Sequence, residues 1–147
     1  MNKIIRKIQY SEKVYRFDVE ASLIAKSRKA GNFVIIRVDA NSERMPLTIA
    51  DADIEKGTIT LVVQKVGLSS TKLCNLNEGD EIHDVVGPLG NPTHIENYGT
   101  VLCAGGGVGV APMLPIIKAL KAAGNRVLSV IAGRSKDLVI MEDEVRE

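Results

Sequence analysis

Residues 100–124 have the sequence TVLCAGGGVGVAPMLPIIKALKAAG, and this stretch decides the fold of the second half of the chain. Its first part, TVLCAGG, is a continuous apolar run that ends in glycines, which is typical of a strand buried on both faces. Residues 111–124 carry apolar side chains at helical spacing, with Pro112 in the first turn and Gly124 at the C-cap. A second apolar run follows at 126–133. Together these segments predict a strand–helix–strand unit, which we expect to be parallel and right-handed.

Four glycines, Gly105, Gly106, Gly107 and Gly109, lie between the first strand and the helix. Glycine permits positive φ and allows the backbone to approach a ligand closely. The helix that follows offers unpaired N–H groups and the positive end of its dipole, which suit a phosphate. The stretch therefore predicts a nucleotide-binding turn. A tight turn that only packs the helix against the strand is the alternative.

The second strand ends without the Asp or Glu that dinucleotide-binding folds commonly place there. Residues 133–137 read GRSKD instead. Arg134 is a candidate for binding the adenosine ribose or its 2′-phosphate, because a guanidinium pairs well with phosphate. An arginine in a solvated turn is an equal alternative, so the choice between NADH and NADPH stays open.

The first two-thirds of the chain is a series of short strands separated by turn residues. Regular spacing of this kind predicts a small antiparallel barrel or sandwich. Pro46 lies within one of these segments and predicts an edge or irregular strand there. The expected strands are 4–10, 14–21, 32–40, 45–50, 58–66 and 81–87.

We place a domain boundary near 96–99, which gives a barrel over 1–97 and an α/β domain over 98–147. One strand–helix–strand unit is an incomplete doubly wound domain, which normally has several more strands. The helix expected from residue 137 also stops in mid-pattern at Glu147. We therefore expect either a fragment of a longer protein or a partner that supplies the rest.

Composition excludes several functional classes. Nineteen Lys and Arg against eighteen Asp and Glu give a net charge of +1, without the basic bias of a nucleic-acid-binding protein. No apolar stretch reaches the roughly 18 residues of a membrane span, and the N-terminus has no apolar core of signal-peptide length. We therefore expect a cytoplasmic protein with no nucleic-acid partner and no membrane insertion.

The cysteines and histidines carry no recognisable site. Cys74 and Cys103 are too few for a four-thiolate cluster or an all-cysteine zinc site. We expect Cys103 to be an inert buried thiol and Cys74 to be partly exposed. His83 and His94 have no nucleophile or metal-ligand partner at a telling spacing, and we expect His83 to face solvent. No metal site is predicted.

Three further motifs precede the glycine turn: RMPLT at 44–48, VGLSSTKL at 66–73 and GPLGNP at 87–92. In this order, the four motifs resemble those of the ferredoxin–NADP reductase superfamily over essentially the whole chain. Within it, MPLTIAD, GPLGNP with IENYG, and GRSKDL look like the flavoprotein small subunits of NADH-dependent reduced ferredoxin:NADP oxidoreductase and sulfide dehydrogenase. The electron-transfer subunit of dihydroorotate dehydrogenase is a near relative of these subunits.

The resemblance implies an FAD-binding barrel followed by an NAD(P)H-binding domain, and it implies roles for individual residues. Thr48 would be the catalytic residue, with its hydroxyl or backbone near flavin N5. The other residues implied to bind FAD are Pro46 and Leu47 at the ring, Val62 and Val63 beside the ring and ribityl chain, and Gly67, Ser69 and Ser70 at the pyrophosphate. Those implied to face NAD(P)H are Gly105, Gly106, Gly107, Gly109 and Val110, with Arg134 as the further candidate.

Two departures from the family pattern matter. Leu47 replaces the usual aromatic residue, and Arg44 lies one position earlier relative to the hydroxyl. Arg44 is therefore either a clamp on the FAD pyrophosphate or a surface arginine. Related subunits also carry a [2Fe–2S] cluster in a C-terminal cysteine-rich segment, which this chain lacks. We expect that cluster in a full-length protein and not in this chain.

The leading hypothesis is a flavin-dependent oxidoreductase subunit that passes electrons between NAD(P)H, FAD and an iron–sulfur centre or ferredoxin. The expected partners are NAD(P)H and either ferredoxin or an iron–sulfur flavoprotein subunit. The alternative is a non-catalytic flavin-binding or assembly module of a larger electron-transfer complex. A reductase that feeds an oxygenase is a weaker third reading.

Overall fold

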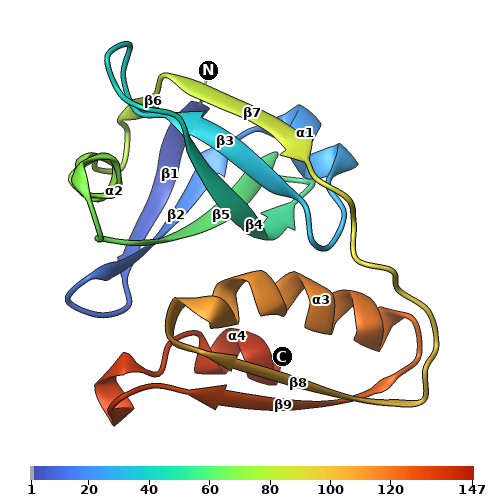
Figure 1. The fold of residues 1–147 in the computed structure, drawn as a ribbon. Helices are drawn as coiled ribbons and strands as arrows, with labels where there is room; N and C mark the ends of the chain where they lie inside the picture. The colour runs from blue at the N-terminus through green and yellow to red at the C-terminus, as the bar shows by residue number, and fades with distance from the viewer. Residues whose placement is uncertain (1) are drawn as a thin grey trace.

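The computed structural model describes residues 2–147, which form a curled antiparallel sheet and a smaller α/β unit packed beneath it (Figure 1). The sheet has the strand order β6-β1-β2-β5-β4-β3-β7, and every pair in it is antiparallel. Its strands are β1 (Asn2–Gln9), β2 (Val14–Glu20), β3 (Phe33–Arg37), β4 (Met45–Asp53), β5 (Thr58–Gln64), β6 (Glu81–Ile82) and β7 (Asp84–Leu89). Two short helices, α1 (Ser22–Ser27) and α2 (Leu68–Cys74), connect them.

The two edge strands of this sheet are consecutive in the chain. β6 pairs with β1 at one edge, β7 pairs with β3 at the other, and only His83 separates them. The sheet must therefore curl until its edges nearly meet, which is the geometry of a small barrel. This confirms the predicted barrel and explains why the single strand expected at 81–87 is two strands. Phe17, Ile36 and Leu61 are fully buried inside it.

The strand that carries Pro46 is irregular, which is one of the two expected alternatives, and it is not an edge strand. β4 lies between β3 and β5, and Pro46 is opposite Ile35 of β3. The pairing of β4 with β5 starts at Ile49 opposite Leu61, so residues 45–48 pair with β3 alone. Proline is tolerated here because one side of this segment forms no strand ladder.

The α/β unit follows the predicted strand–helix–strand order. It consists of β8 (Thr100–Gly106), the 3₁₀ turn Gly107–Gly109, α3 (Val110–Ala122) and β9 (Arg126–Ala132). β8 and β9 are parallel, with Gly106 opposite Ala132 at their carboxyl ends. Residues 91–99, which contain the predicted boundary, have no helix or strand.

The helix expected over 137–147 is shorter than predicted. A 3₁₀ turn occupies Lys136–Leu138, and α4 (Glu142–Arg146) begins only after Met141. Met141 has a φ of 59°, and this left-handed conformation cannot continue a right-handed helix. Its side chain is nevertheless buried against the rest of the unit.

Helix α3 lies between the barrel and the two parallel strands (Figure 1). A single apolar core joins Val110 and Leu114 of this helix to Ala50 and Val62 of the barrel and to Cys103 of β8. The barrel and the α/β unit are therefore held together by packing, as well as by the chain that connects them. None of the helices in the described part of the chain is long and apolar enough to cross a membrane.

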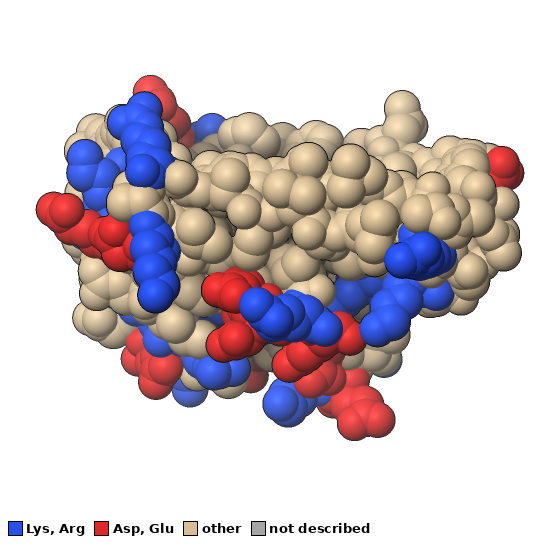
Figure 2. Space-filling view, turned by 90° about the horizontal axis from the view of Figure 1, so that it is seen from below, with Lys and Arg blue, Asp and Glu red and all other residues tan. Residues whose placement is uncertain are grey.

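The strands β8 and β9 are covered on one face only. Leu102, Leu128 and Val130 point away from α3 and are 65%, 44% and 54% exposed. The prediction that both faces are buried is therefore wrong for these residues, since α3 and the segment that leads into α4 both pack on the opposite face. Figure 2 views the molecule from this side and shows a broad area without charged side chains. In parallel sheets of this kind an apolar face is usually covered by helices, as the other face is here.

A polar cluster fastens α4 to the barrel. The Tyr10 hydroxyl donates to Oε1 of Glu144 over 2.5 Å, and Arg16 Nη1 lies 3.3 Å from the same oxygen. Arg16 also pairs with Asp18 on the same strand. Burial raises the pKa of Tyr10 to about 12, and the hydrogen bond to Glu144 acts in the same direction.

This cluster predicts late ionisation of one of the three tyrosines. The folded pKa of Tyr10 is above the ordinary value of 10, so its stabilising effect is complete below pH 10 and is lost as the pH rises through 12. We expect a loss on the order of 2 kcal/mol in the free energy of unfolding across this window. Tyrosinate absorbance should show one late transition that Tyr10→Phe removes and the control Tyr98→Phe keeps. A late transition that survives in Tyr10→Phe contradicts the assignment.

Candidate functional site

A cleft of about 700 Å³ opens at the carboxyl ends of β8 and β9. The glycine turn contributes Gly106 and Gly107, and the segment after β9 contributes Arg134. The opposite wall belongs to the barrel, through Val14 and Gln64 at the ends of β2 and β5. In α/β folds, ligands bind outside the carboxyl ends of the parallel strands, and this cleft has that position. The structure therefore places three of the predicted nucleotide-binding residues in one cavity.

Three of the four glycines in the turn differ in how far the fold itself requires glycine at their positions. Gly107 has a φ of 56°, which an L-residue adopts only with strain. A Cβ on Gly105 would lie 3.1 Å from Sδ of Met113, so glycine allows close packing of helix on strand there. Gly109 has a φ of −64°, and a Cβ on it would meet nothing within 4 Å. The fold has no need of glycine at 109, which leaves room for a ligand close to the backbone.

Val110 does not face the cleft as the resemblance implied. Its side chain is fully buried in the core shared with the barrel, and its N–H donates to the carbonyl of Gly107. It therefore fixes the turn in place instead of contacting a ligand with its side chain.

The predicted flavin-ring residues separate into two faces of the barrel wall. Leu47 and Val63 pack toward the barrel core, and Val63 is only 2% exposed, so its side chain is not accessible to a ligand. Thr48 is on the opposite face of β4 from Leu47, the face that also carries Pro46. Thr48 also directly precedes the point where β4 joins β5.

Val62 connects this face to the glycine turn. It lies one residue beyond the Ile49–Leu61 pair, and it packs in the same core as Val110 and the rest of α3. Thr48 is thus at the rim of the interface between the barrel and α3. The structure brings the predicted flavin-ring segment and the predicted nucleotide turn to the same interface.

The loop before α2 is shaped by Ser70. Its Oγ accepts hydrogen bonds from the N–H groups of Val66 at 2.9 Å and Gly67 at 3.0 Å, and it donates to the carbonyl of Gly67. Ser70 is 4% exposed, so its hydroxyl serves the loop and is not free for a phosphate. Ser69 is partly exposed, and a Cβ on Gly67 would meet nothing within 4 Å.

Arg44 is exposed and lies just before β4. The loop that precedes it is fastened to α2, because Lys72 Nζ lies 3.1 Å from a carboxylate oxygen of Asp39 and 3.4 Å from the Ser42 hydroxyl. The Ser42 hydroxyl, followed by Lys72, lowers the pKa of Asp39 to about 2. The contact draws the loop before Arg44 toward α2, whose first turn follows Gly67.

The cysteines and histidines have structural positions. Cys103 is 8% exposed, as expected, but Cys74 is only 2% exposed in the barrel core, so the expectation that it is partly exposed is wrong. Burial raises the pKa of both thiols. His83 is exposed at the corner between β6 and β7, and His94 contacts Glu96 at 2.9 Å on the surface.

Sequence reasoning missed one wall of the cleft. Ser11, Glu12 and Lys13, in the turn between β1 and β2, line it together with Gln64. Turn residues between two predicted strands carry no motif, and their position opposite the glycines depends on how the barrel packs on α3.

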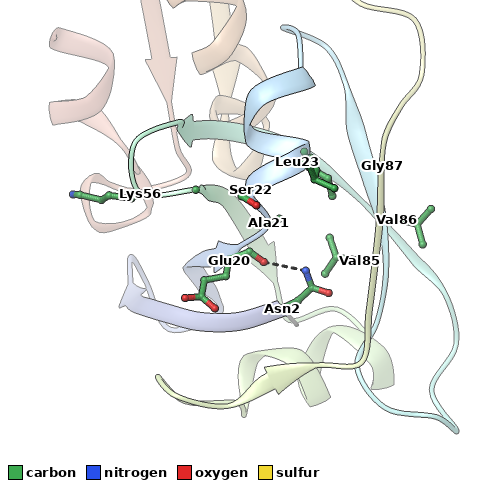
Figure 3. A pocket seen from close by; sticks show the side chains of 11 residues that line it. Asn2, Glu20, Ala21, Ser22, Leu23, Lys56, Val85, Val86 and Gly87 are labelled. Atoms are coloured by element: carbon green, nitrogen blue, oxygen red, sulfur yellow. Dashed lines mark hydrogen bonds between the residues drawn. The ribbon is translucent and has the colours of Figure 1, made fainter.

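A second cavity, of about 680 Å³, lies between α1 and β7 (Figure 3). Leu23 and Val86 flank it, and the Asn2 side chain donates to the carbonyl of Glu20 within it. Of the motif residues it contains only Gly87, and it contains none of the residues predicted to bind a cofactor, so we do not assign it to the same site.

Gly107 and Gly109 should differ in how much stability is lost on substitution by alanine. Gly107→Ala should lower the free energy of unfolding by about 1–2 kcal/mol, because it forces a left-handed conformation on a Cβ-bearing residue. Gly109→Ala should change it by less than about 0.5 kcal/mol, since the added methyl group meets open space. Urea unfolding of both variants measures this difference. A large loss in Gly109→Ala would show that glycine is needed there by the fold itself.

No protein-family model matches the chain, but several known proteins are similar to it. It is 48% identical over 147 residues to the dihydroorotate dehydrogenase B (NAD⁺) electron transfer subunit homolog of Thermotoga maritima, covering 100% of this chain and 52% of that protein. The chain therefore spans about half the length of this curated relative.

Solved structures of electron-transfer proteins are also similar to this chain. A structure of NADH-dependent reduced ferredoxin–NADP oxidoreductase, described in connection with flavin-based electron bifurcation, is 48% identical with a TM-score of 0.95, over 99% of this chain and 52% of that one. Phthalate dioxygenase reductase, described as transferring electrons from pyridine nucleotides to [2Fe–2S], shares the fold, with 21% identity and a TM-score of 0.79 over 99% and 47%. The chain is thus a close homologue of the dihydroorotate dehydrogenase B electron transfer subunits, and its barrel and partial nucleotide-binding unit have the fold of the ferredoxin–NADP reductase family.

Proposed function

We propose that this chain is the flavin- and nicotinamide-binding part of an oxidoreductase that passes electrons between NAD(P)H, FAD and an iron–sulfur centre or ferredoxin. The observation that carries the proposal is the cleft at the carboxyl ends of β8 and β9, which joins the glycine turn and Arg134 to the barrel wall. The relatives support it, since one is named as an NAD⁺-linked electron transfer subunit and another as NADH-dependent.

The residues present fit a dinucleotide on the barrel side. Gly67 has an extended backbone, with φ of −162°, that any residue adopts, and a Cβ on it would meet only open space. Gly67 is the N-cap of α2, where glycine is common, and the absence of a side chain there would also let a ligand approach the backbone. Gly67 and Ser69 would hold the pyrophosphate of FAD, while Ser70 keeps their loop in shape through its hydrogen bonds.

The flavin ring would lie along Pro46 and Thr48, where β4 is not paired with β5. The exposed Arg44, on the loop that Lys72 fastens to α2, would pair with the FAD pyrophosphate. Thr48 would donate its hydroxyl or backbone N–H toward flavin N5. Val62 would form the apolar floor beside the ring, and Leu47 and Val63 would support that wall from the barrel core.

Bound FAD would supply the redox chemistry, since a flavin accepts two electrons from a nicotinamide and can release them singly. The protein would position the nicotinamide and the flavin relative to each other. The glycine turn would hold the phosphates of NAD(P)H, and α3 fixes that turn against the barrel. Placing reacting groups about 3–3.5 Å apart is worth several kcal/mol of the barrier. Because both cysteines are buried and only two are present, the iron–sulfur acceptor would lie outside this chain.

The second candidate function is an assembly module that binds flavin without turnover. The open face of β8 and β9, with Leu102, Leu128 and Val130 exposed, favours it, because this unit has fewer strands than a complete nucleotide-binding domain. Contact of that face with further protein would then be required before NAD(P)H binds.

The purified chain, reconstituted with FAD, tests both candidates. We expect the visible spectrum of a bound flavin and, under anaerobic conditions, its bleaching by NADH or NADPH. Reduction of an artificial acceptor by the chain alone would exclude the assembly reading, whereas flavin binding without reduction would support it. A colourless protein that takes up no added FAD would sink the proposal.

Two pairs of variants test the roles proposed for Thr48, Gly67 and Gly109. Thr48→Ala should slow flavin reduction about five- to tenfold through loss of one hydrogen bond, while the control Thr100→Ala, exposed at the far end of β8, should not. Gly67→Ala should weaken FAD binding and leave NADH binding to the FAD-loaded protein intact, whereas Gly109→Ala should do the reverse. Equal effects of both alanines on FAD would contradict the assignment of two separate sites.

A further inference from the structure

The barrel contributes a charged turn to the nucleotide cleft. Ser11, Glu12 and Lys13 join β1 to β2, and all three line the cavity on the side opposite Gly106 and Gly107. The described side chains around this cavity carry three charges, those of Glu12, Lys13 and Arg134. Arg134 belongs to the α/β unit and Lys13 to the barrel, so a cation is available from each side.

The turn is held in place from three directions. The N–H of Lys65 donates to the carbonyl of Lys13 over 2.8 Å, which fastens the turn to the end of β5. Val14, the next residue, is 7% exposed in the core shared with α3. Tyr10, at the other end of the turn, donates to Glu144 of α4. Because the backbone is already ordered, little conformational entropy remains to be lost there when a ligand binds.

The two cations are not used by the fold. Within residues 2–147, neither Lys13 nor Arg134 takes part in an ion pair, and both are exposed. Glu12 has no ion-pair partner in the same part of the chain either. The charges of these three side chains sum to one net positive charge, which faces the glycine turn that we propose binds phosphate.

We propose that Lys13 binds a phosphate of the nicotinamide dinucleotide from the barrel side of the cleft, while Glu12 beside it weakens the attraction for that anion. The inference rests on the proposed function of the cleft and adds to it a residue outside every motif. It makes nucleotide binding dependent on the packing of the barrel against α3, because the ligand contacts both.

Calorimetric titration of the FAD-loaded chain with ADP-ribose, and separately with its 2′-phosphate, tests this without requiring turnover. Lys13→Gln should weaken binding of both ligands about three- to tenfold, as expected for the loss of one charge-assisted contact. Lys13→Arg should restore most of the affinity, and Glu12→Gln should tighten binding. The affinity of the original chain should fall with added salt more steeply than that of Lys13→Gln.

Lys3→Gln is the matched control, because Lys3 is exposed on β1, at the end of that strand remote from the turn. If the original chain binds neither ligand, the proposed function of the cleft fails. If it binds them and Lys13→Gln behaves like Lys3→Gln, the proposed function stands and the role of Lys13 is refuted. An unchanged melting temperature in Lys13→Gln separates loss of binding from loss of folding.

Discussion

The site depends on the packing of helix α3 against two surfaces at once. Val110 and Leu114 are almost completely buried, and the core that contains them includes Ala50 and Val62 from the barrel as well as Cys103 from β8. Because the first residue of the helix is buried, the glycine turn before it cannot move independently of the barrel strands. The helix therefore sets where the turn lies relative to Thr48, through these apolar contacts and through the ion pair of Lys118 on α3 with Asp51 on β4.

The barrel provides the other half of this arrangement through its closure. β6 and β7 are consecutive but lie at opposite edges, so the sheet curls and β4 is placed between β3 and β5. The pairing of β4 with β5 then ends at Ile49, which leaves residues 45–48 with a strand on one side only. This free side lies next to Val62 and thus next to α3. Closure of the barrel and burial of the helix together bring a segment with unpaired backbone to the interface.

Much of this follows from the sequence, and the exceptions have physical causes. The strand–helix–strand unit was predictable because apolar periodicity and the glycines between 105 and 109 agree with each other. The resemblance of the four motifs indicated the barrel and its order relative to that unit. The split of the 81–87 segment at His83 was not predictable, since it depends on pairing with strands far away in the chain. The same holds for the turn at 11–13, whose position opposite the glycines depends on how the barrel packs on α3.

The glycines show why a motif alone assigns function poorly. At Gly107 the backbone angle favours glycine, and at Gly105 the close packing of Met113 does, so the fold itself gives a reason for glycine at both positions. At Gly109 and Gly67 neither reason exists, because both have backbone angles open to any residue and free space where a side chain would lie. The proposed ligands, lying close to the backbone, would account for glycine at both positions, and at Gly67 the N-cap of α2 also favours it. These two positions lie on different elements, one before α3 and one before α2, and this separation is what two nucleotides sharing one interface would require.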